Sequence, residues 1–444
     1  MNKIVLFLLV TIGMIMLFQD CKKSGGETVT PKKSYTLTVS LAEGINGSPG
    51  TGTYTYNQGD TVTYDYSLKN GYANLTVTRN NSQLSASGTF TISGDVRLTA
   101  SHSFLLQNIV QVRTGSQFRD RADIIWLLDL LVDYGIYGIE LTVKQDEDDE
   151  FSSGYAFYNS SIAPVAAGYE NFDALQITIF EARKRGLKVF AWLPQFHDKA
   201  AVERNAGWQM KALVNGDVVA YTGKNPQHPE YFVNPTDESV KDYQLSIIAE
   251  VAANYDIDGL FIDWVRFDDW NMDMNDSTRQ AYQNAAGIDP ANIDFTTDNA
   301  DRQAWNRWRQ AVIADYIGKA KAKVAEIKPG LPMGVHILPP EFSEVAQDPG
   351  QFGASIDYVS PLAYWDDWGY ATSWTWETML LQTVGLVDET KIIPDLDTDW
   401  SNDDAAAVVN NIKNIYPRIQ KVLWFKYANW TRRSLSKIQS LNQE

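Results

Sequence analysis

The chain has 444 residues, of which 44% are hydrophobic and 21% are charged, and its formal net charge at pH 7 is -17. This composition excludes a generally disordered or collagen-like chain, and the acidic balance argues against nucleic acid as a partner, because the protein's field repels phosphates. The single cysteine rules out an intrachain disulfide and a cysteine-based zinc site. The four histidines contain no His-x-x-x-His pair, so we predict no metal centre.

The N-terminal segment resembles a bacterial lipoprotein signal. A short positive start at residues 1–3 precedes an uncharged, mostly apolar stretch at 4–18, which is too short for a comfortable membrane span. We expect residues 1–20 to be a signal peptide and Cys21 to be lipidated, although the usual small residues before the cysteine are missing. An ordinary signal peptide with an incidental cysteine is the alternative. Residues 21–33 are polar and predict a flexible tether to a membrane of the cell envelope, facing the periplasm or the exterior.

Residues 34–104 predict a small all-β domain of short antiparallel strands. Polar and apolar residues alternate with period two, as in Tyr35–Val39 and Thr61–Tyr66, and turn-forming residues separate these runs. An immunoglobulin-like or β-grasp-like module fits this pattern. The segment contains no tryptophan and resembles the spacer modules of bacterial surface proteins, so a spacer is favoured over a carbohydrate-binding module.

From residue 105 onward, short apolar runs alternate with helical stretches, which indicates a parallel sheet. Eight strand–helix units between residues 105 and 444 predict a TIM-like (β/α)8 barrel with enlarged loops. The alternative, an open doubly wound sheet, usually begins with a glycine-rich turn that is not visible here. The predicted strands are Ile109–Arg113, Ile136–Val143, Lys188–Leu193, Gly259–Asp263, Pro332–Ile337, Tyr358–Ala363, Lys391–Leu396 and Val422–Tyr427.

Alternation along the predicted strands points to charges inside the barrel. One side of strands two, four, seven and eight is apolar and suits helix packing, whereas the other side carries charges near the C-terminal ends, where barrel enzymes place their chemistry. On strand eight we assign Leu423 and Phe425 to the helix side. A salt bridge inside the barrel is the alternative for the mid-strand Glu140, with Lys144 or Lys426 as its partner. The charged sides carry Glu140, Lys144, Asp263, Asp395, Asp397 and Lys426.

Tryptophans gather just after the predicted strand ends. All 14 lie after residue 104. The flat faces of sugar rings stack on aromatic rings while carboxylates bind the hydroxyls, so repeated tryptophans beside aspartates indicate an acidic glycan-binding cleft. The tryptophans near strand ends are Trp192, Trp264, Trp270, Trp365, Trp368, Trp400 and Trp430.

Three segments resemble the bacterial glycosyl-hydrolase-like barrel families, which include lipoproteins similar to glycoside hydrolase family 10: Phe190–Asp198, Tyr231–Pro235 and Tyr255–Phe267. The third segment is the most specific, and Asp268 follows it where these families usually have proline. Lys144 also begins a segment that is similar to their Lys-Asp-Asp element. The resemblance covers about residues 105–430. It implies a (β/α)8 fold, activity on a polysaccharide and Asp263 as the leading catalytic carboxylate.

Glycoside hydrolysis needs two carboxyl groups, one to protonate the leaving oxygen and one to attack the anomeric carbon or activate water. Asp263 is the first choice for nucleophile or base, and Arg266 is a possible orienting cation. For the second carboxyl, Asp397 is favoured and Glu341 is the runner-up; Asp366, Asp367 and Asp395 remain open. The predicted substrate-binding residues are Lys144, Trp192, Gln195, His197, Trp264, Arg266, His336, Tyr364, Trp365, Asp366, Asp395, Trp400 and Lys426.

We therefore predict a glycoside hydrolase acting on a polysaccharide or oligosaccharide without a cofactor. A non-catalytic glycan-binding lipoprotein on a barrel scaffold is the alternative, and a structural protein of the envelope is a third possibility. The loop at 269–275 alternates acidic and amide residues like the start of a calcium loop. Because Met274 replaces the required glycine and Gln280 the bidentate glutamate, a solvated polar loop is favoured over calcium.

Overall fold

In a computed structural model of the protein, the described residues form two compact units. One comprises Met1–Lys69 and Leu75–His102, and the other comprises Asn70–Asn74 and Ser103–Glu444. Most of the predicted signal peptide and tether, including Cys21, lies outside the described residues. The structure describes residues 32–42, 44–68, 72–104, 106–146, 153–397, 404–425 and 432–443.

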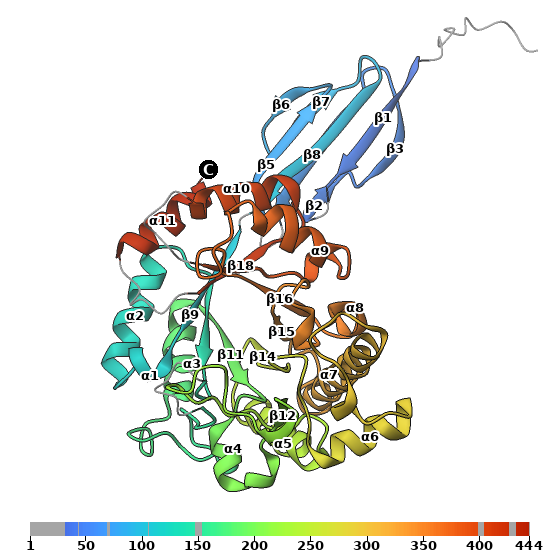
Figure 1. Ribbon diagram of the computed structural model, residues 1–444. Helices are drawn as coiled ribbons and strands as arrows, with labels where there is room; N and C mark the ends of the chain where they lie inside the picture. The colour runs from blue at the N-terminus through green and yellow to red at the C-terminus, as the bar shows by residue number, and fades with distance from the viewer. Residues whose placement is uncertain are drawn as a thin grey trace, which may run out of the picture. The chain divides into compact units, whose positions relative to one another are not determined.

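The smaller unit is an all-β structure of two sheets, which confirms the predicted fold class (Figure 1). One sheet has the order β3-β1-β8-β5-β6 and the other β2-β4-β7; β1 and β8 run parallel, while the other described pairs are antiparallel. Side chains from both sheets, such as Leu37 and Tyr64, share one buried core. The strands are β1 (Ser34–Leu41), β2 (Ile45–Ser48), β3 (Gly52–Asn57), β4 (Thr61–Leu68), β5 (Tyr72–Arg79), β6 (Ser82–Leu84), β7 (Ser87–Thr91) and β8 (Val96–Phe104).

The larger unit is the predicted TIM-like barrel, in which eight parallel strands of the described chain close in the order β10-β11-β14-β15-β16-β17-β18-β9. The seventh strand is shorter than predicted, because Glu389–Lys391 forms a 3-10 turn and pairing begins only at Asp395. The strands are β9 (Gln107–Val112), β10 (Gly138–Thr142), β11 (Lys188–Pro194), β14 (Gly259–Asp263), β15 (Met333–Ile337), β16 (Tyr358–Ala363), β17 (Asp395–Asp397) and β18 (Lys421–Phe425), and the hairpin β12 (Lys211–Val214) and β13 (Asp217–Ala220).

Helices surround the barrel strands (Figure 1). Local signals set their ends: Asp120 caps α2 by accepting backbone N–H groups, and Gly186 closes α3 in the left-handed conformation. No helix in the described ranges is long and apolar enough to cross a bilayer. The helices are α1 (Thr114–Gln117), α2 (Arg121–Asp133), α3 (Ala174–Arg185), α4 (Lys199–Arg204), α5 (Glu238–Asn254), α6 (Asp276–Ala286), α7 (Ala300–Ile327), α8 (Pro349–Phe352), α9 (Leu380–Val384), α10 (Asp404–Ile415) and α11 (Arg432–Gln443), and the short turns are η1 (Ala206–Trp208), η2 (Pro290–Asn292), η3 (Ser343–Val345), η4 (Thr375–Met379) and η5 (Glu389–Lys391).

The barrel strands separate two apolar cores. Outward residues such as Ile139 and Leu260 pack in the helix-facing core, whereas Phe190 and Phe261 belong to a cluster inside the barrel. The predicted parity therefore holds for β10, β14 and β17.

The predicted parity of strand eight was wrong. Leu423 and Phe425 lie in the interior cluster, while Val422 and Trp424 pack in the helix-facing core. Both sides of this strand are apolar, so hydrophobic alternation does not distinguish them. The interior assignment of Lys426 depended on that parity, and Lys426 itself lies outside the described residues.

We expect Gly334→Ala to destabilise the barrel by about 1–3 kcal/mol, because an overpacked core is strained. A Cβ atom at Gly334 would lie 2.3 Å from Cε1 of Phe261. Urea unfolding followed by tryptophan fluorescence measures the change. The control is Gly318→Ala on α7, where the added methyl meets no atom within 4 Å and should stabilise the helix. Equal stability of Gly334→Ala and wild type would contradict the close packing around Phe261.

Candidate active site

A hollow of about 360 Å³, which we call the barrel pocket, opens where the strands end. Its size falls in the range of small-molecule sites. Its aromatic lining is Trp192, Trp264, Phe342, Tyr364, Trp368 and Phe425. Its charged lining is Arg113, Asp146, Lys224, Asp263, Arg266, Asp268 and Glu344.

Asp263 ends β14 and is held by two N–H donors. Its Oδ2 accepts the indole N–H of Trp192 at 3.1 Å, and its Oδ1 accepts the backbone N–H of Trp264 at 2.6 Å. Trp264 has a φ of 53°, a left-handed conformation that is strained for a bulky side chain and often marks functional sites. The sharp turn places Asp263 and the Trp264 ring on the lining of the same pocket.

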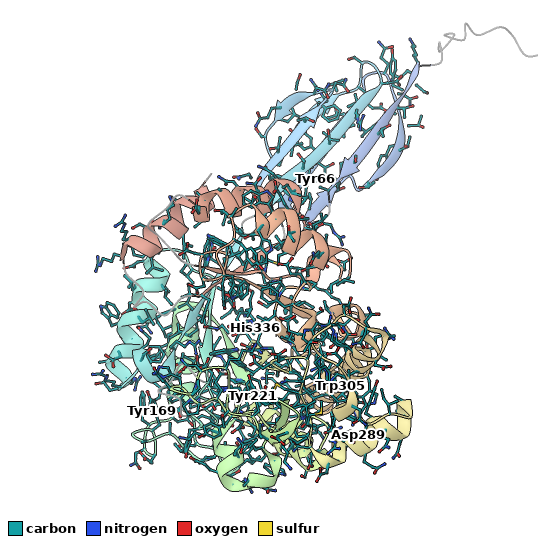
Figure 2. All side chains as sticks on the ribbon, in the orientation of Figure 1. Tyr66, Tyr169, Tyr221, Asp289, Trp305 and His336 are labelled. Atoms are coloured by element: carbon teal, nitrogen blue, oxygen red, sulfur yellow. The ribbon has the colours of Figure 1, made fainter. Side chains whose placement is uncertain are left out.

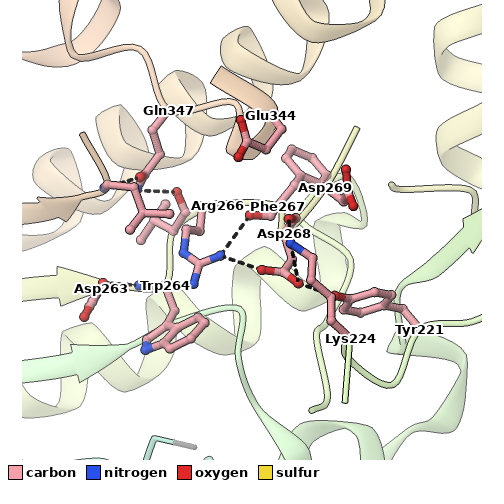
Figure 3. Close-up of polar contacts among 12 residues, drawn as sticks. Tyr221, Lys224, Asp263, Trp264, Arg266, Phe267, Asp268, Asp269, Glu344 and Gln347 are labelled. Atoms are coloured by element: carbon pink, nitrogen blue, oxygen red, sulfur yellow. Dashed lines mark hydrogen bonds and ion pairs between the residues drawn. The ribbon is translucent and has the colours of Figure 1, made fainter. Parts of the chain in front are cut away.

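A cluster around Asp268 forms another part of the pocket lining (Figure 3). Arg266 donates to its Oδ1 at 3.1 Å, Tyr221 donates to its Oδ2, and the Lys224 Nζ lies 3.7 Å from the same oxygen. Burial raises the pKa of Asp268, but Arg266 and these neighbours outweigh it and leave that pKa below its ordinary value. The Arg266 guanidinium also lies 4.1 Å from the centre of the Trp264 ring. Asp268 therefore orients Arg266 directly and the Trp264 ring through Arg266.

A second ion pair joins the ends of β9 and β10. Arg113 Nη1 lies 2.5 Å from Asp146 Oδ2, and both residues line the barrel pocket. The Arg113 guanidinium stacks on Trp192 at 4.5 Å and on Phe425 at 5.1 Å from the ring centres. This pair fixes two of the aromatic rings of the pocket lining.

Beneath the pocket lies a fully buried polar cluster inside the barrel. Glu140 accepts from Gln111 at 2.9 Å and lies 2.8 Å from Nε2 of His336, whose Nδ1 is 3.6 Å from Oδ2 of Asp395. Tyr364, which lines the pocket, donates to the same Asp395 oxygen at 2.9 Å. Figure 2 shows His336 among the side chains of the larger unit. The alternative of a Glu140 salt bridge to Lys144 is wrong: the partner is His336.

The buried cluster shifts two pKa values upward. Burial disfavours the imidazolium of His336, but Glu140, Asp263 and Asp395 outweigh it and raise its pKa to about 9. Burial also raises the pKa of Asp395 well above its ordinary value, although the positive His336 opposes this. A pKa of about 9 favours the imidazolium form of His336 at neutral pH, and this ring lies between the side chains of Glu140 and Asp395.

Several predicted binding residues are buried outside the pocket lining. Lys144 is fully buried, and its Nζ lies 2.9 Å from Asp198 and 2.8 Å from Gln244; burial lowers its pKa while Asp198 opposes this. Gln195 accepts the hydroxyl of Tyr316 at 2.5 Å. The structure therefore gives Lys144 and Gln195 packing roles in place of the predicted sugar contacts.

Two further predicted sugar contacts have buried imidazole rings. His336 belongs to the cluster below the pocket, and the His197 ring packs 4.7 Å from the Trp264 ring. Burial and then Arg266 lower the pKa of His197 to about 3, so it is neutral. Neither ring is part of the pocket lining, so each supports residues that are.

After β15 and β16, the residues that line the pocket lie three positions later in the sequence than the predicted ones. Trp365 packs in the helix-facing core, and Trp368 lines the pocket instead. Asp366 and its neighbour Asp367 are exposed and outside the lining. Glu341 is exposed and accepts the indole N–H of Trp374 at 2.8 Å. The pocket carboxyl on this segment is Glu344.

Three predicted residues are not placed. Asp397 closes β17, but its side chain lies outside the described part, as do Trp400 and Lys426. Their predicted roles stay predictions.

Side chains of the 269–275 loop form hydrogen bonds with other residues of the protein. Buried Asp273 accepts from Thr278 at 2.7 Å, and burial raises its pKa to about 6. Asn271 donates to Leu213. Across the described ranges, no group of three or more acidic, histidine or cysteine residues could hold a metal ion.

Sequence reasoning missed several pocket residues. Gln111 and Arg113 alternate on strand one, so a parity test of that strand would have found them. Asp146 ends the Lys-Asp-Asp-like segment that was noted for Lys144. Glu344 and Lys224 lie in loops without periodicity, and no sequence signal identifies them.

The closed barrel and the acidic, aromatic pocket at its C-terminal end define a TIM-barrel protein with an enzyme-like site. The model of the family glycosyl hydrolase-like 10 matches residues 106–380, more than half of the chain, and the protein therefore belongs to that family. This confirms the predicted resemblance.

Curated relatives match over parts of their length. The chain is 23% identical over 217 residues to glycosyl hydrolase DigH of Escherichia coli K12, covering 47% of this chain and 45% of the relative. It is 29% identical over 146 residues to an S-layer-related protein of Niallia circulans, covering 30% of this chain and 9% of the relative. The match thus spans less than half the length of either relative.

Solved structures share the fold. The glycoside hydrolase domain of PgaB (BpsB) from Bordetella bronchiseptica has a TM-score of 0.59 at 16% identity, covering 72% of this chain and 94% of that chain. The catalytic domain of β-amylase from Paenibacillus polymyxa has a TM-score of 0.52 at 12% identity, covering 77% and 98%. At these identities the likeness shows the barrel fold alone.

We expect His336→Gln to lower the free energy of unfolding most at acidic to neutral pH. Because the folded pKa of His336, about 9, exceeds its ordinary 6.5, protonation stabilises the fold fully below about pH 6.5, and this contribution is lost as pH rises through 9. The loss relative to wild type should be about 3 kcal/mol near pH 6 and shrink toward pH 9.5. Urea unfolding at several pH values measures it. A difference that stays constant with pH would contradict the imidazolium assignment.

Proposed function

We propose that the protein is a glycoside hydrolase that cleaves a polysaccharide or oligosaccharide in the barrel pocket, with Asp263 as nucleophile or base. The observation that carries this proposal is Asp263 itself. It ends a barrel strand on the lining of a pocket, and both of its oxygens accept N–H bonds. Donors on both oxygens suit a carboxylate, and they hold its position for attack on an anomeric carbon or for activation of water.

The rest of the lining suits a sugar. Trp264 and Trp368 offer aromatic faces that are only partly buried, and Tyr364 stacks on Phe425 with ring centres 4.8 Å apart. Aromatic faces bind the C–H faces of sugar rings, while charged side chains such as Arg266 bind hydroxyls. Membership in the glycosyl hydrolase-like 10 family supports the same reaction class.

We expect Asp263→Asn to reduce glycan turnover by at least about 100-fold while the protein still folds, because the amide keeps the shape but not the nucleophilic charge. One of the two N–H donors then faces the amide NH2 and loses its acceptor, so a modest loss of thermal stability is expected. The assay incubates the purified protein with plant, host and bacterial polysaccharides and measures released reducing ends. The matched control is Asp366→Asn, which changes an exposed aspartate outside the lining and should keep full activity.

Full activity of Asp263→Asn would contradict the assignment of Asp263 as nucleophile or base. Binding of a polysaccharide by the wild type without any release of reducing ends would favour a non-catalytic glycan-binding protein. Neither binding nor release would favour a structural role in the envelope.

A lipid anchor at Cys21 in the cell envelope is part of the proposal. Its support is the sequence of residues 1–20, since this segment lies outside the described residues. We expect bacteria fed labelled palmitate to incorporate label into the wild-type chain and not into Cys21→Ser. Label on both proteins, or on neither, would contradict the anchor.

A further inference from the structure

We infer that Glu344 is the second carboxyl of the reaction, the group that protonates the leaving oxygen. This inference rests on the proposed hydrolase function and names a residue that neither the sequence nor the family match identifies.

Among the described residues, four carboxylic side chains line the barrel pocket, and three of them are engaged. Asp146 is paired with Arg113, Asp268 is held by Arg266 and Tyr221, and Asp263 is held by two N–H groups. Arg266 and its neighbours keep the pKa of Asp268 below its ordinary value, which makes Asp268 a poor general acid, and the oxygen of Asp146 is committed to its ion pair with Arg113.

Glu344 differs from the other three. Its side chain is half-buried, and within the part of the chain that the structure describes no side-chain nitrogen lies within ion-pair distance of its carboxylate. Figure 3 accordingly draws no hydrogen bond or ion pair to the Glu344 carboxyl group. Among the four, it is thus the pocket carboxyl whose oxygens are left open to a substrate oxygen.

The backbone around Glu344 is fixed by hydrogen bonds, whereas its carboxyl group forms none among the described residues and acts on Arg309 only through its charge. Glu344 lies in the short turn η3, and buried Arg309 of α7 donates to its carbonyl oxygen at 3.0 Å. Asn306 of the same helix donates to the carbonyl of Ser343 at 2.8 Å.

The same contacts fix Glu344 relative to the segment after Asp263. Arg309 also donates to the carbonyls of Asp269 and Met272 at 2.6 Å each, and the backbone N–H of Phe267 donates to the carbonyl of Val345 at 3.0 Å. The loop that follows Asp263 is therefore held to the turn that carries Glu344, and both carboxyl groups lie on the lining of the same pocket.

The proposed step balances as a hydrolysis. As the glycosidic C–O bond breaks, the Glu344 proton passes to the leaving oxygen, and the anomeric carbon takes an oxygen from Asp263 or from a water that Asp263 activates. One water is consumed overall: its hydroxyl ends on the anomeric carbon, and its other proton restores Glu344, directly or by way of Asp263.

The test compares Glu344→Gln with its matched control Glu341→Gln, which lies three residues earlier on the same segment, is exposed and is outside the pocket lining. On the polysaccharide that the wild type cleaves, we expect Glu344→Gln to lower kcat by about 10²–10⁴-fold and Glu341→Gln to keep wild-type activity. The dinitrophenyl glycoside of the released sugar supplies the distinguishing readout. Because dinitrophenolate leaves without a proton, Glu344→Gln should lose far less activity on it than on the polymer.

The other outcomes distinguish the hydrolase function from the assignment of Glu344 as its general acid. Full activity of Glu344→Gln on the polymer while Asp263→Asn is inactive overturns the Glu344 assignment and leaves the hydrolase function standing. An equal loss on polymer and dinitrophenyl glycoside also overturns it, since that indicates a binding or packing defect. Glu344→Asp keeps a carboxyl group and should retain more polymer activity than Glu344→Gln even if either change lowers the thermal midpoint. No turnover of any polymer by the wild type contradicts both the hydrolase function and the Glu344 assignment.

Discussion

The buried ion cluster on the barrel axis is the constraint on which the pocket depends. Glu140 and Asp395 reach the interior from β10 and β17, and burying two carboxyl groups is costly unless a cation or a proton compensates. His336 from β15 supplies that compensation by lying between them. Because Tyr364 donates a hydrogen bond to Asp395 and Asp263 raises the pKa of His336, the buried cluster and the pocket carboxylate Asp263 are electrostatically coupled.

At the rim of the pocket, formed by the loops after the strands, charged side chains are paired with one another. Its ion pairs hold aromatic rings and loop backbones in place, as Arg113 does for Trp192 and as Arg266 does for Trp264. Arg309 ties the rim together from outside the pocket, since its guanidinium donates to carbonyl oxygens of two different loops. A fully buried guanidinium without a carboxylate partner in the described chain requires such acceptors, and these bonds fix both loops at once.

Family membership and fold place the protein among TIM barrels, in which the loops after the strands form the active site. The strands supply Asp263 and the buried cluster, while the segments after β11, β14, β15 and β16 supply Lys224, Asp268, Glu344 and Trp368. The chain matches under half the length of DigH at 23% identity. The identity of the proposed sugar substrate therefore depends on these loops, because fold alone does not define a function.

The amino-acid sequence by itself determined the barrel, the parity of β10, β14 and β17 and the place of Asp263, because apolar and charged residues alternate there and period two assigns each side chain a face. The same alternation does not assign the faces of β18, because both of its faces are apolar. Only the tertiary structure decided that Trp368 and Glu344, and not Trp365 and Glu341, face the pocket. These residues lie in turns without a repeating pattern, and the direction of each side chain is set by contacts with distant segments, as Arg309 sets the turn at Glu344.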